Sequence, residues 1–170
     1  MRIVRKDLST GQGGFSLIEV LVTLVIVSMG TLGMAGMQAV SMKSNTFALQ
    51  ETQAATLAQD MVERIRANPE GDYTSGFGEV PGAQGEPVPI CHGVAAVCDA
   101  AAMAQFDLLD WKCTLGAAAG SELCEGITSQ GQLPDGDASI SVVDNIYTIV
   151  ISWTDATSDT PRTVTFSTAL

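Results

Sequence analysis

The apolar segment from residue 15 to residue 42 constrains this chain most, because a single carboxylate, Glu19, is its only charged side chain. As a helix that rises ~1.5 Å per residue, the segment would be ~42 Å long. That length exceeds the ~30 Å hydrocarbon core of a bilayer, so the segment is long enough to span a membrane. A lone carboxylate in such a segment is costly and usually functional. Glu19 is therefore the first candidate functional residue.

The features that precede this segment are in the reverse order of a secretory signal peptide, where the apolar region comes before a cleavage site with small residues. Here basic residues come first, Gly14 follows, and the apolar segment begins at Phe15. Cleavage after Gly14 would leave the hydrophobic helix on the mature chain. The basic leader would keep the N-terminus in the cytoplasm. A plain single-pass anchor is the simpler alternative, but it leaves Glu19 unexplained.

Residues 13–22, Gly-Gly-Phe-Ser-Leu-Ile-Glu-Val-Leu-Val, resemble the class III signal of type IV pilins and pseudopilins. Residues 25–38 are similar to those of PilV-type minor pilins in particular. The resemblance implies that a prepilin peptidase cuts after Gly14 and methylates the amine of Phe15. It also implies that Glu19 acts in subunit docking, where its partner would be the N-terminal ammonium of a neighbouring subunit.

Three glycines, Gly30, Gly33 and Gly36, lie in the segment where many major pilins carry a helix-bending proline. Each glycine costs roughly 1 kcal/mol of helix propensity relative to alanine. One interpretation is close helix–helix packing, since small residues let backbones approach in a membrane. The other is helix flexibility, in which the segment unwinds locally when the subunit leaves the lipid for a filament. Both interpretations remain open.

The helical pattern continues past Lys43, with apolar residues at steps of three and four that form one stripe: Phe47, Ala54, Leu57, Ala58, Met61 and Ile65. The pair Asn68-Pro69 predicts that the helix ends near Ala67. The expected organisation is a leader peptide (1–14), a transmembrane or filament-core half of the helix (15–42) and a periplasmic or extracellular head domain (43–170).

The region from Pro69 to about Asp137 is rich in Gly, Pro and Ala and is typical of loops. A second helix is predicted inside it, with Asp99 as the N-cap and an end near Ala119, before Gly120. Its aromatic residues Phe106 and Trp111 are expected in the core.

The four cysteines, Cys91, Cys98, Cys113 and Cys124, are spaced C-x6-C and C-x10-C. An even number in an exported domain indicates two disulfides, for which three connectivities are possible. Pairing Cys91 with Cys98 and Cys113 with Cys124 is favoured, because each pair closes a short loop. The spacing fits no zinc template, although His92 adjoins Cys91, so no metal and no cofactor are expected.

Three strands are predicted near the C-terminus, over Ala138–Val143, Ile146–Trp153 and about Arg162–Thr168, with a tight turn at Asp144-Asn145. An antiparallel sheet with one apolar face needs a cover, and the helical stripe can supply it. The prediction is an α+β fold of the pilin kind. A long N-terminal helix packs on a C-terminal antiparallel β-sheet, with a disulfide-containing loop region between them.

The net charge of −11 argues against a nucleic-acid partner, which would require clustered basic residues. The chain has a single histidine, His92, and no nucleophile elbow or phosphate-binding glycine loop is apparent. We therefore expect no catalytic residues and a structural role rather than an enzymatic one.

The resemblance implies a minor pilin that helps to prime type IV pilus assembly and enters the pilus, near its tip. Its partners would be other minor pilins, the major pilin, the prepilin peptidase and the assembly machinery of the inner membrane. The chain would be inserted there with its head domain in the periplasm before it reaches the cell surface. Two alternatives remain: a minor pseudopilin of a type II secretion system, and a membrane-anchored adhesin that binds through its loop region.

Overall fold

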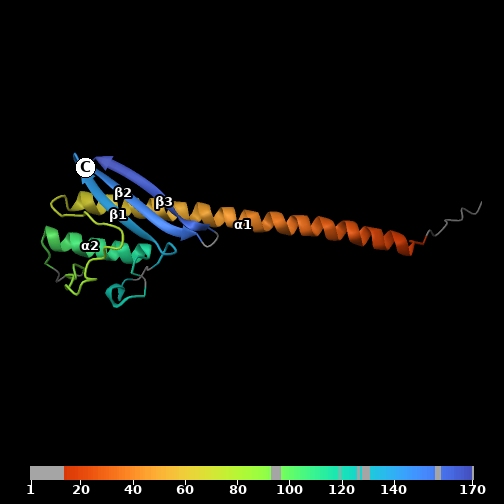
Figure 1. The fold of residues 1–170 in the computed structure, drawn as a ribbon, viewed down its shortest axis with the longest axis horizontal. Helices are drawn as coiled ribbons and strands as arrows, with labels where there is room; N and C mark the ends of the chain where they lie inside the picture. Colours follow the sequence, from red (N-terminus) through yellow and green to blue (C-terminus); the bar gives the residue numbers. More distant parts are fainter. Residues whose placement is uncertain are drawn as a thin grey trace, which may run out of the picture. The chain divides into compact units, whose positions relative to one another are not determined.

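The computed structural model describes residues 14–92, 97–118, 120–125, 127, 131–155 and 158–169. Its elements, in chain order, are α1 (Leu17–Ala67), α2 (Ala100–Leu115), the short 3-10 helix η1 (Glu122–Cys124), β1 (Asp137–Val143), β2 (Ile146–Asp155) and β3 (Ser158–Ala169) (Figure 1). The chain divides into two compact units, Met1–Thr46 and Phe47–Leu170.

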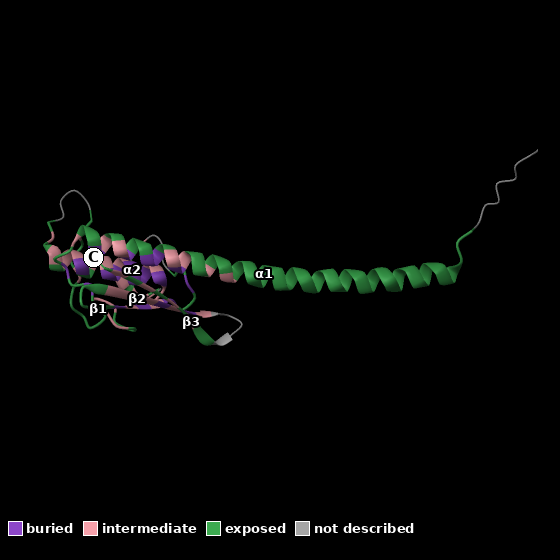
Figure 2. Ribbon diagram, turned by 90° about the horizontal axis from the view of Figure 1, so that it is seen from above, coloured by how far each residue is buried: buried purple, intermediate pink, exposed green. Residues whose placement is uncertain are grey.

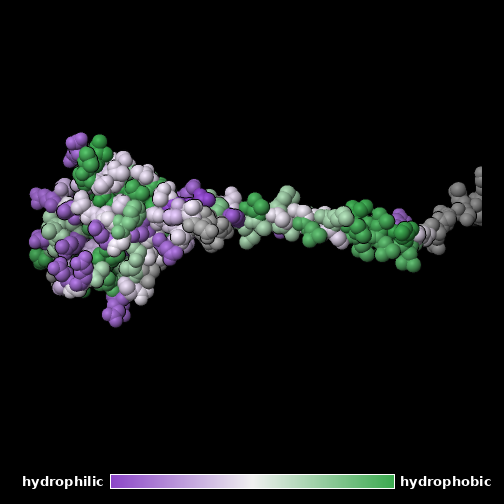
Figure 3. Space-filling model, in the orientation of Figure 1, coloured by the Kyte–Doolittle hydropathy of each residue, from purple (hydrophilic) through white to green (hydrophobic). Residues whose placement is uncertain are grey.

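The described part of the first unit is the N-terminal portion of α1. The carbonyl of Ser16 accepts the N–H groups of Glu19 (3.0 Å) and Val20 (3.3 Å), which closes the first turn. Every side chain from Phe15 to Thr46 is exposed. Figure 3 shows that hydrophobic residues cover much of this portion of the helix.

Three hydroxyl side chains within this apolar helix bond to the helix itself. The hydroxyls of Thr23, Ser28 and Thr31 donate to backbone carbonyls three or four residues earlier, at 2.6–2.9 Å. A hydroxyl that is satisfied in this way needs no water, which is the condition for a polar group in hydrocarbon. This part of α1 is long and apolar enough to cross a membrane.

In the second unit, α1 buries the predicted stripe against the rest of the unit. Ala54, Leu57, Ala58, Met61 and Ile65 are buried, whereas Phe47 at the start of the stripe is half-buried. The helix ends at Ala67, as predicted, because Pro69 lacks the N–H that a further turn requires and disfavours helical geometry at Asn68.

The predicted second helix is present, but its expected end was wrong. Asp99 is the N-cap, and its Oδ1 accepts the N–H of Ala102 at 2.8 Å. The helix ends at Leu115 rather than near Ala119, and Gly116 follows it with φ 130°. A Cβ at Gly116 would lie 2.8 Å from the carbonyl oxygen of Leu133. Gly116 is therefore the glycine that ends the helix, and the backbone of Leu133 leaves no room for a side chain there.

The three strands form an antiparallel sheet in the order β1-β2-β3. The turn between β1 and β2 contains Asp144 (φ 50°) and Asn145 (φ 64°), the two positive φ values of a tight type I′ hairpin. The sheet matches the prediction, although β1 begins one residue earlier and both β2 and β3 extend beyond the expected ranges.

The second unit has two layers, with α1 and α2 on one side and the three strands on the other (Figure 2). The core between the layers joins the buried stripe of α1 to Trp111 of α2 and to Ile149, Ile151 and Trp153 of β2. Phe106 is not part of this core. It is half-buried, with its ring centroid 5.7 Å from that of His92. The predicted α+β fold, with the helical stripe as the cover of the sheet, is confirmed.

Candidate functional site

The predicted processing and docking residues lie together at the N-terminal end of α1. Gly14, Phe15 and Ser16 precede the helix, and the Phe15 side chain is 84% exposed. Glu19 lies in the first helical turn and is also exposed. The rest of the predicted leader, residues 1–13, lies outside the described residues. The amine that cleavage after Gly14 would create and the Glu19 carboxylate therefore belong to the same helix end.

Glu19 forms no ion pair with any residue that the structure describes. The partial positive charge at a helix N-terminus is a favourable place for a carboxylate. That contribution, typically ~0.3–1 kcal/mol, is small beside the several kcal/mol that desolvating a carboxylate costs. A membrane or filament environment would therefore favour a further cation near Glu19.

The three glycines of the segment leave α1 unbroken. A Cβ at Gly30, Gly33 or Gly36 would meet no atom within 4 Å apart from the helix's own nearby backbone. Contacts within the described chain therefore do not require glycine at these positions.

Two disulfides brace the loop region of the second unit. Cys91 is bonded to Cys98, and Cys113 is bonded to Cys124, the pairing that the short spacings favour. Cys113 and Cys124 are fully buried in a small apolar cluster with Leu109. The second disulfide thus links the end of α2 to the loop that follows it.

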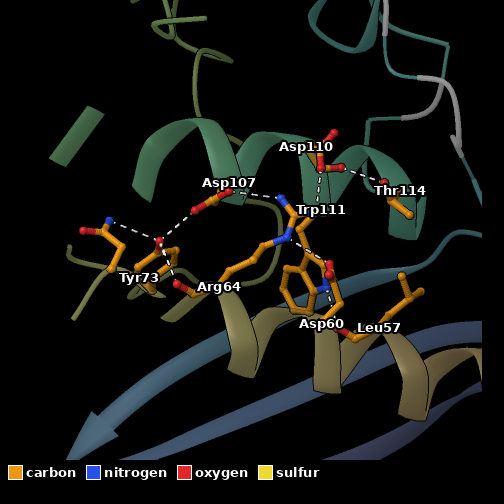
Figure 4. Close-up of polar contacts among 9 residues, drawn as sticks. Leu57, Asp60, Arg64, Tyr73, Asp107, Asp110, Trp111 and Thr114 are labelled. Atoms are coloured by element: carbon orange, nitrogen blue, oxygen red, sulfur yellow. Dashed lines mark hydrogen bonds and ion pairs between the residues drawn. The ribbon is translucent and has the colours of Figure 1, made fainter. Parts of the chain in front are cut away.

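Arg64 of α1 holds α2 through two carboxylates. Its guanidinium lies 3.1 Å from Asp107 and 2.7 Å from Asp110 on α2, and 2.9 Å from Asp60 on its own helix (Figure 4). Burial would lower the pKa of Arg64, but the hydrogen bond to Asp110 and the three carboxylate charges outweigh it and raise the pKa. Arg64 therefore stays charged and ties the two helices together.

Tyr73 adds a second connection beside Arg64. Its hydroxyl donates to Asp107 at 2.7 Å and accepts from the Asn68 amide at 3.2 Å (Figure 4). Burial, followed by the hydrogen bond to Asp107, raises the pKa of Tyr73 to about 12. The indole N–H of Trp111 also donates to the Leu57 carbonyl at 2.8 Å, so α2 is fixed to α1 by polar as well as apolar contacts.

Lys112, which no sequence motif singles out, connects α2 to β1. Its side chain is fully buried, and its ammonium lies 2.7 Å from the Asp137 carboxylate. It also donates to the carbonyls of Gly76, at 2.9 Å, and Ala138. Burial lowers the pKa of Lys112, against the hydrogen bond and charge of Asp137 and the charge of Glu79. The position of Lys112 between two buried residues of the helix could have indicated a buried lysine. It could not have identified Asp137 as the partner.

Arg64 and Lys112 connect elements of the second unit and do not line an open reaction site. Arg64 and Lys112 are occupied by carboxylates and carbonyls from the elements that they join. Their geometry supports a second unit in which α1, α2, the loop between them and β1 hold one another in place.

Two family models match the chain. One, described as a prokaryotic N-terminal methylation motif, matches residues 9–35, which include Gly14, Phe15 and Glu19. The other, described as type IV pilin Tt1218, matches residues 36–109. No curated protein and no solved structure matches the chain.

The two matches adjoin and together extend from residue 9 to residue 109. The methylation motif and the exposed apolar helix that follows it suggest membrane anchoring and incorporation into a pilus. The match to a type IV pilin, the adjoining methylation motif and the α+β fold of the second unit together support the assignment of this chain to the type IV pilin-like family, as a pilin subunit.

Proposed function

We propose that the chain is a minor pilin of the PilV type that helps to start pilus assembly. It is made as a prepilin with a leader (1–14), a membrane and filament-core helix (15–42) and a head domain (43–170). The leader stays in the cytoplasm and the head domain lies in the periplasm. The prepilin peptidase cleaves after Gly14 and methylates the new amine of Phe15.

The observation that carries this proposal is the position of Glu19, an exposed carboxylate in the first turn of an otherwise apolar exposed helix. In a filament, the ammonium of Phe15 in a neighbouring subunit supplies the missing cation. Two unit charges ~4 Å apart attract by ~4 kcal/mol at an effective dielectric constant of ~20. Attraction of this size favours a subunit that is docked in register over one that remains isolated in lipid.

The assignment to minor pilins rests on the sequence likeness over residues 25–38. In this role the chain joins other minor pilins in a priming complex and contacts the major pilin and the inner-membrane assembly machinery. It then remains near the pilus tip. The strongly acidic composition argues against a nucleic acid as its partner.

The glycines contribute to the transfer from the membrane to the filament. Gly30, Gly33 and Gly36 lower the helix propensity of the middle of the apolar segment by roughly 1 kcal/mol each. Because their Cβ positions are open, they also permit close approach of a neighbouring helix. Both properties favour insertion among other subunits.

Replacing Glu19 tests the docking role. Glu19→Ala should leave the chain in the inner membrane but prevent its appearance in sheared pili, and should lower the number of pili. Glu70→Ala, which removes an exposed carboxylate outside the apolar helix, is the matched control and should change neither. Normal piliation and normal pilus content in the Glu19→Ala strain would refute the docking role.

Deletion of the gene separates the alternatives. Loss of twitching motility with intact protein secretion supports a pilus subunit, whereas the reverse indicates a pseudopilin of a type II secretion system. Unchanged pilus number with loss of surface binding would indicate an adhesin. Co-purification from detergent followed by mass spectrometry would identify the neighbouring subunits, the cleavage site and the N-methyl group together.

A further inference from the structure

The two edges of the sheet in the second unit differ in whether another segment covers their backbone groups. The outer edge of β1 is covered at Ile140, which exchanges backbone hydrogen bonds with Ser75 in both directions, at 2.7 and 3.1 Å. The loop before α2 thus occupies this edge. On the opposite edge, β3 has β2 as its only neighbour among the described strands.

The register shows which backbone groups β3 leaves open. Ile140 directs its N–H and C=O toward Ser75, so its partner Ile149 directs its own toward β3. Ile149 faces Phe166, and these two residues therefore form a hydrogen-bonded pair. By alternation, the N–H and C=O groups of Thr163, Thr165 and Ser167 point away from the sheet.

This open edge lacks the features that usually protect an edge strand. Pro161 and Arg162 lie near the start of β3, but residues 163–168 contain neither proline nor a charged side chain. Thr163, Thr165 and Ser167 are exposed, and they alternate with half-buried residues that face α1. An uncharged edge that alternates in this way is a template for another strand.

A groove runs beside this edge, between β3 and α1. It has a volume of about 590 Å³ and is lined by Ala58, Val62 and Glu63 of α1 and by Phe166 of β3, among others. Val62 and Phe166 are half-buried, so their apolar surface is only partly covered. On the other side of α1, α2 packs beside β1; in Figure 1, β3 lies at the sheet edge away from α2.

We propose that β3 accepts an extended segment of a second, different protein as a fourth strand of the sheet. Apolar side chains at alternate positions of that segment enter the groove between Val62 and Phe166. Its backbone bonds to Thr163, Thr165 and Ser167. The net charge of −11 opposes pairing with a second copy of this chain and favours a strand with basic residues. These residues would meet Glu63 at the groove, where they would compete with its present partner Arg66, at 2.7 Å.

This inference goes beyond the proposed function, because it concerns the second unit alone and does not depend on cleavage or on Glu19. It is tested on the purified full chain in detergent micelles. The probe is a fluorescein-labelled peptide, Thr-Lys-Thr-Val-Thr-Val-Thr-Lys-Thr, whose valines and lysines share one face of the strand. We expect saturable binding by fluorescence anisotropy. We also expect slower amide hydrogen exchange at Thr163, Thr165 and Ser167, with little change at the already bonded Phe166.

Two variants separate strand addition from other modes of binding. Thr165→Pro removes one outward N–H without removing a bond to β2, and should weaken peptide binding about tenfold. The matched control, Val142→Pro, removes an outward N–H from the other edge of the sheet and should have no effect. Glu63→Lys leaves both strands intact and should weaken binding several-fold at low salt.

Absence of peptide binding, or equal binding by the Thr165→Pro and Val142→Pro chains of unchanged circular dichroism, would overturn the proposal. Uniform slowing of exchange along β3 would also overturn it, because strand addition predicts alternation. A peptide with the sequence of residues 163–168 tests whether a second copy of this chain binds at β3 instead. Tighter binding of that peptide than of the lysine peptide would replace the proposed partner with a second copy of this chain.

Discussion

Lys112 offers the sharpest test of how the second unit is held together. Replacing it with methionine keeps most of the side-chain volume but removes the ammonium. The Asp137 carboxylate then loses its cation, and the carbonyls of Gly76 and Ala138 each lose a donor. All these groups lie at the junction of α2, the loop before it and β1.

The expected cost follows from the burial of the pair. Removing one partner of a buried ion pair typically costs ~3–5 kcal/mol, because the other charge is left uncompensated. Asp137 is partly exposed, at 20% of its side chain, and keeps the N–H groups of Gly78 and Ala138 as donors. These donors place the expected loss near the lower end, at about 3 kcal/mol.

The assay is guanidinium denaturation of the full chain in detergent, with the disulfides intact and tryptophan fluorescence as the signal. Trp111 and Trp153 are both buried in the second unit, so they report its unfolding. The control is Arg66→Met. This change breaks an exposed pair with Glu63, whose side chains are 50% and 69% accessible, and should cost less than about 1 kcal/mol.

A double-mutant cycle with Asp137→Asn isolates the pair from the rest of the side chain. Because the two residues interact directly, the double variant should lose less stability than the sum of the single variants. A loss below about 1 kcal/mol for Lys112→Met, equal to the Arg66→Met control, would refute the view that the buried ammonium holds this junction.

Three further measurements probe other parts of the second unit. Tyr73 keeps its proton to about pH 12 in the folded chain but loses it near pH 10 when unfolded. The contribution of the raised pKa to the free energy of unfolding is therefore complete below pH 10 and is lost as the pH rises toward 12. The stability advantage over Tyr73→Phe in urea denaturation should therefore shrink by about 2–3 kcal/mol across that window, and a constant advantage would contradict the shift. Replacing Cys113 and Cys124 together with alanine opens a loop with a sequence separation of 11 and should cost about 3 kcal/mol in the same titration at neutral pH; an unchanged midpoint would contradict this. Gly136→Ala would place a Cβ 2.5 Å from the carbonyl oxygen of Leu115, so it should lower the thermal midpoint followed by circular dichroism, with a loss of about 1–3 kcal/mol; an unchanged midpoint would show that the backbone can move there.

Much of the fold could be predicted because its signals are local. The stripe of α1, the N-cap at Asp99 and the hairpin turn at Asp144-Asn145 depend on residues only a few positions apart. The pairing of the four cysteines was also favoured by short separations. The end of α2 was predicted wrongly because two glycines could end the helix, and Gly116, which Leu133 approaches closely, ends it rather than Gly120.

By itself, the sequence determined the features that depend on order and spacing along the chain. The order of leader, Gly14, Phe15 and Glu19 indicated the pilin family and led to the prediction that Glu19 is the docking residue, because a cleavage site and a helix end need only neighbouring residues. Only the tertiary structure decided that Lys112 meets Asp137, that Arg64 bridges to α2, and that β3 rather than β1 keeps an open edge. These relations join residues far apart in the chain, and they depend on how two layers pack rather than on any periodicity.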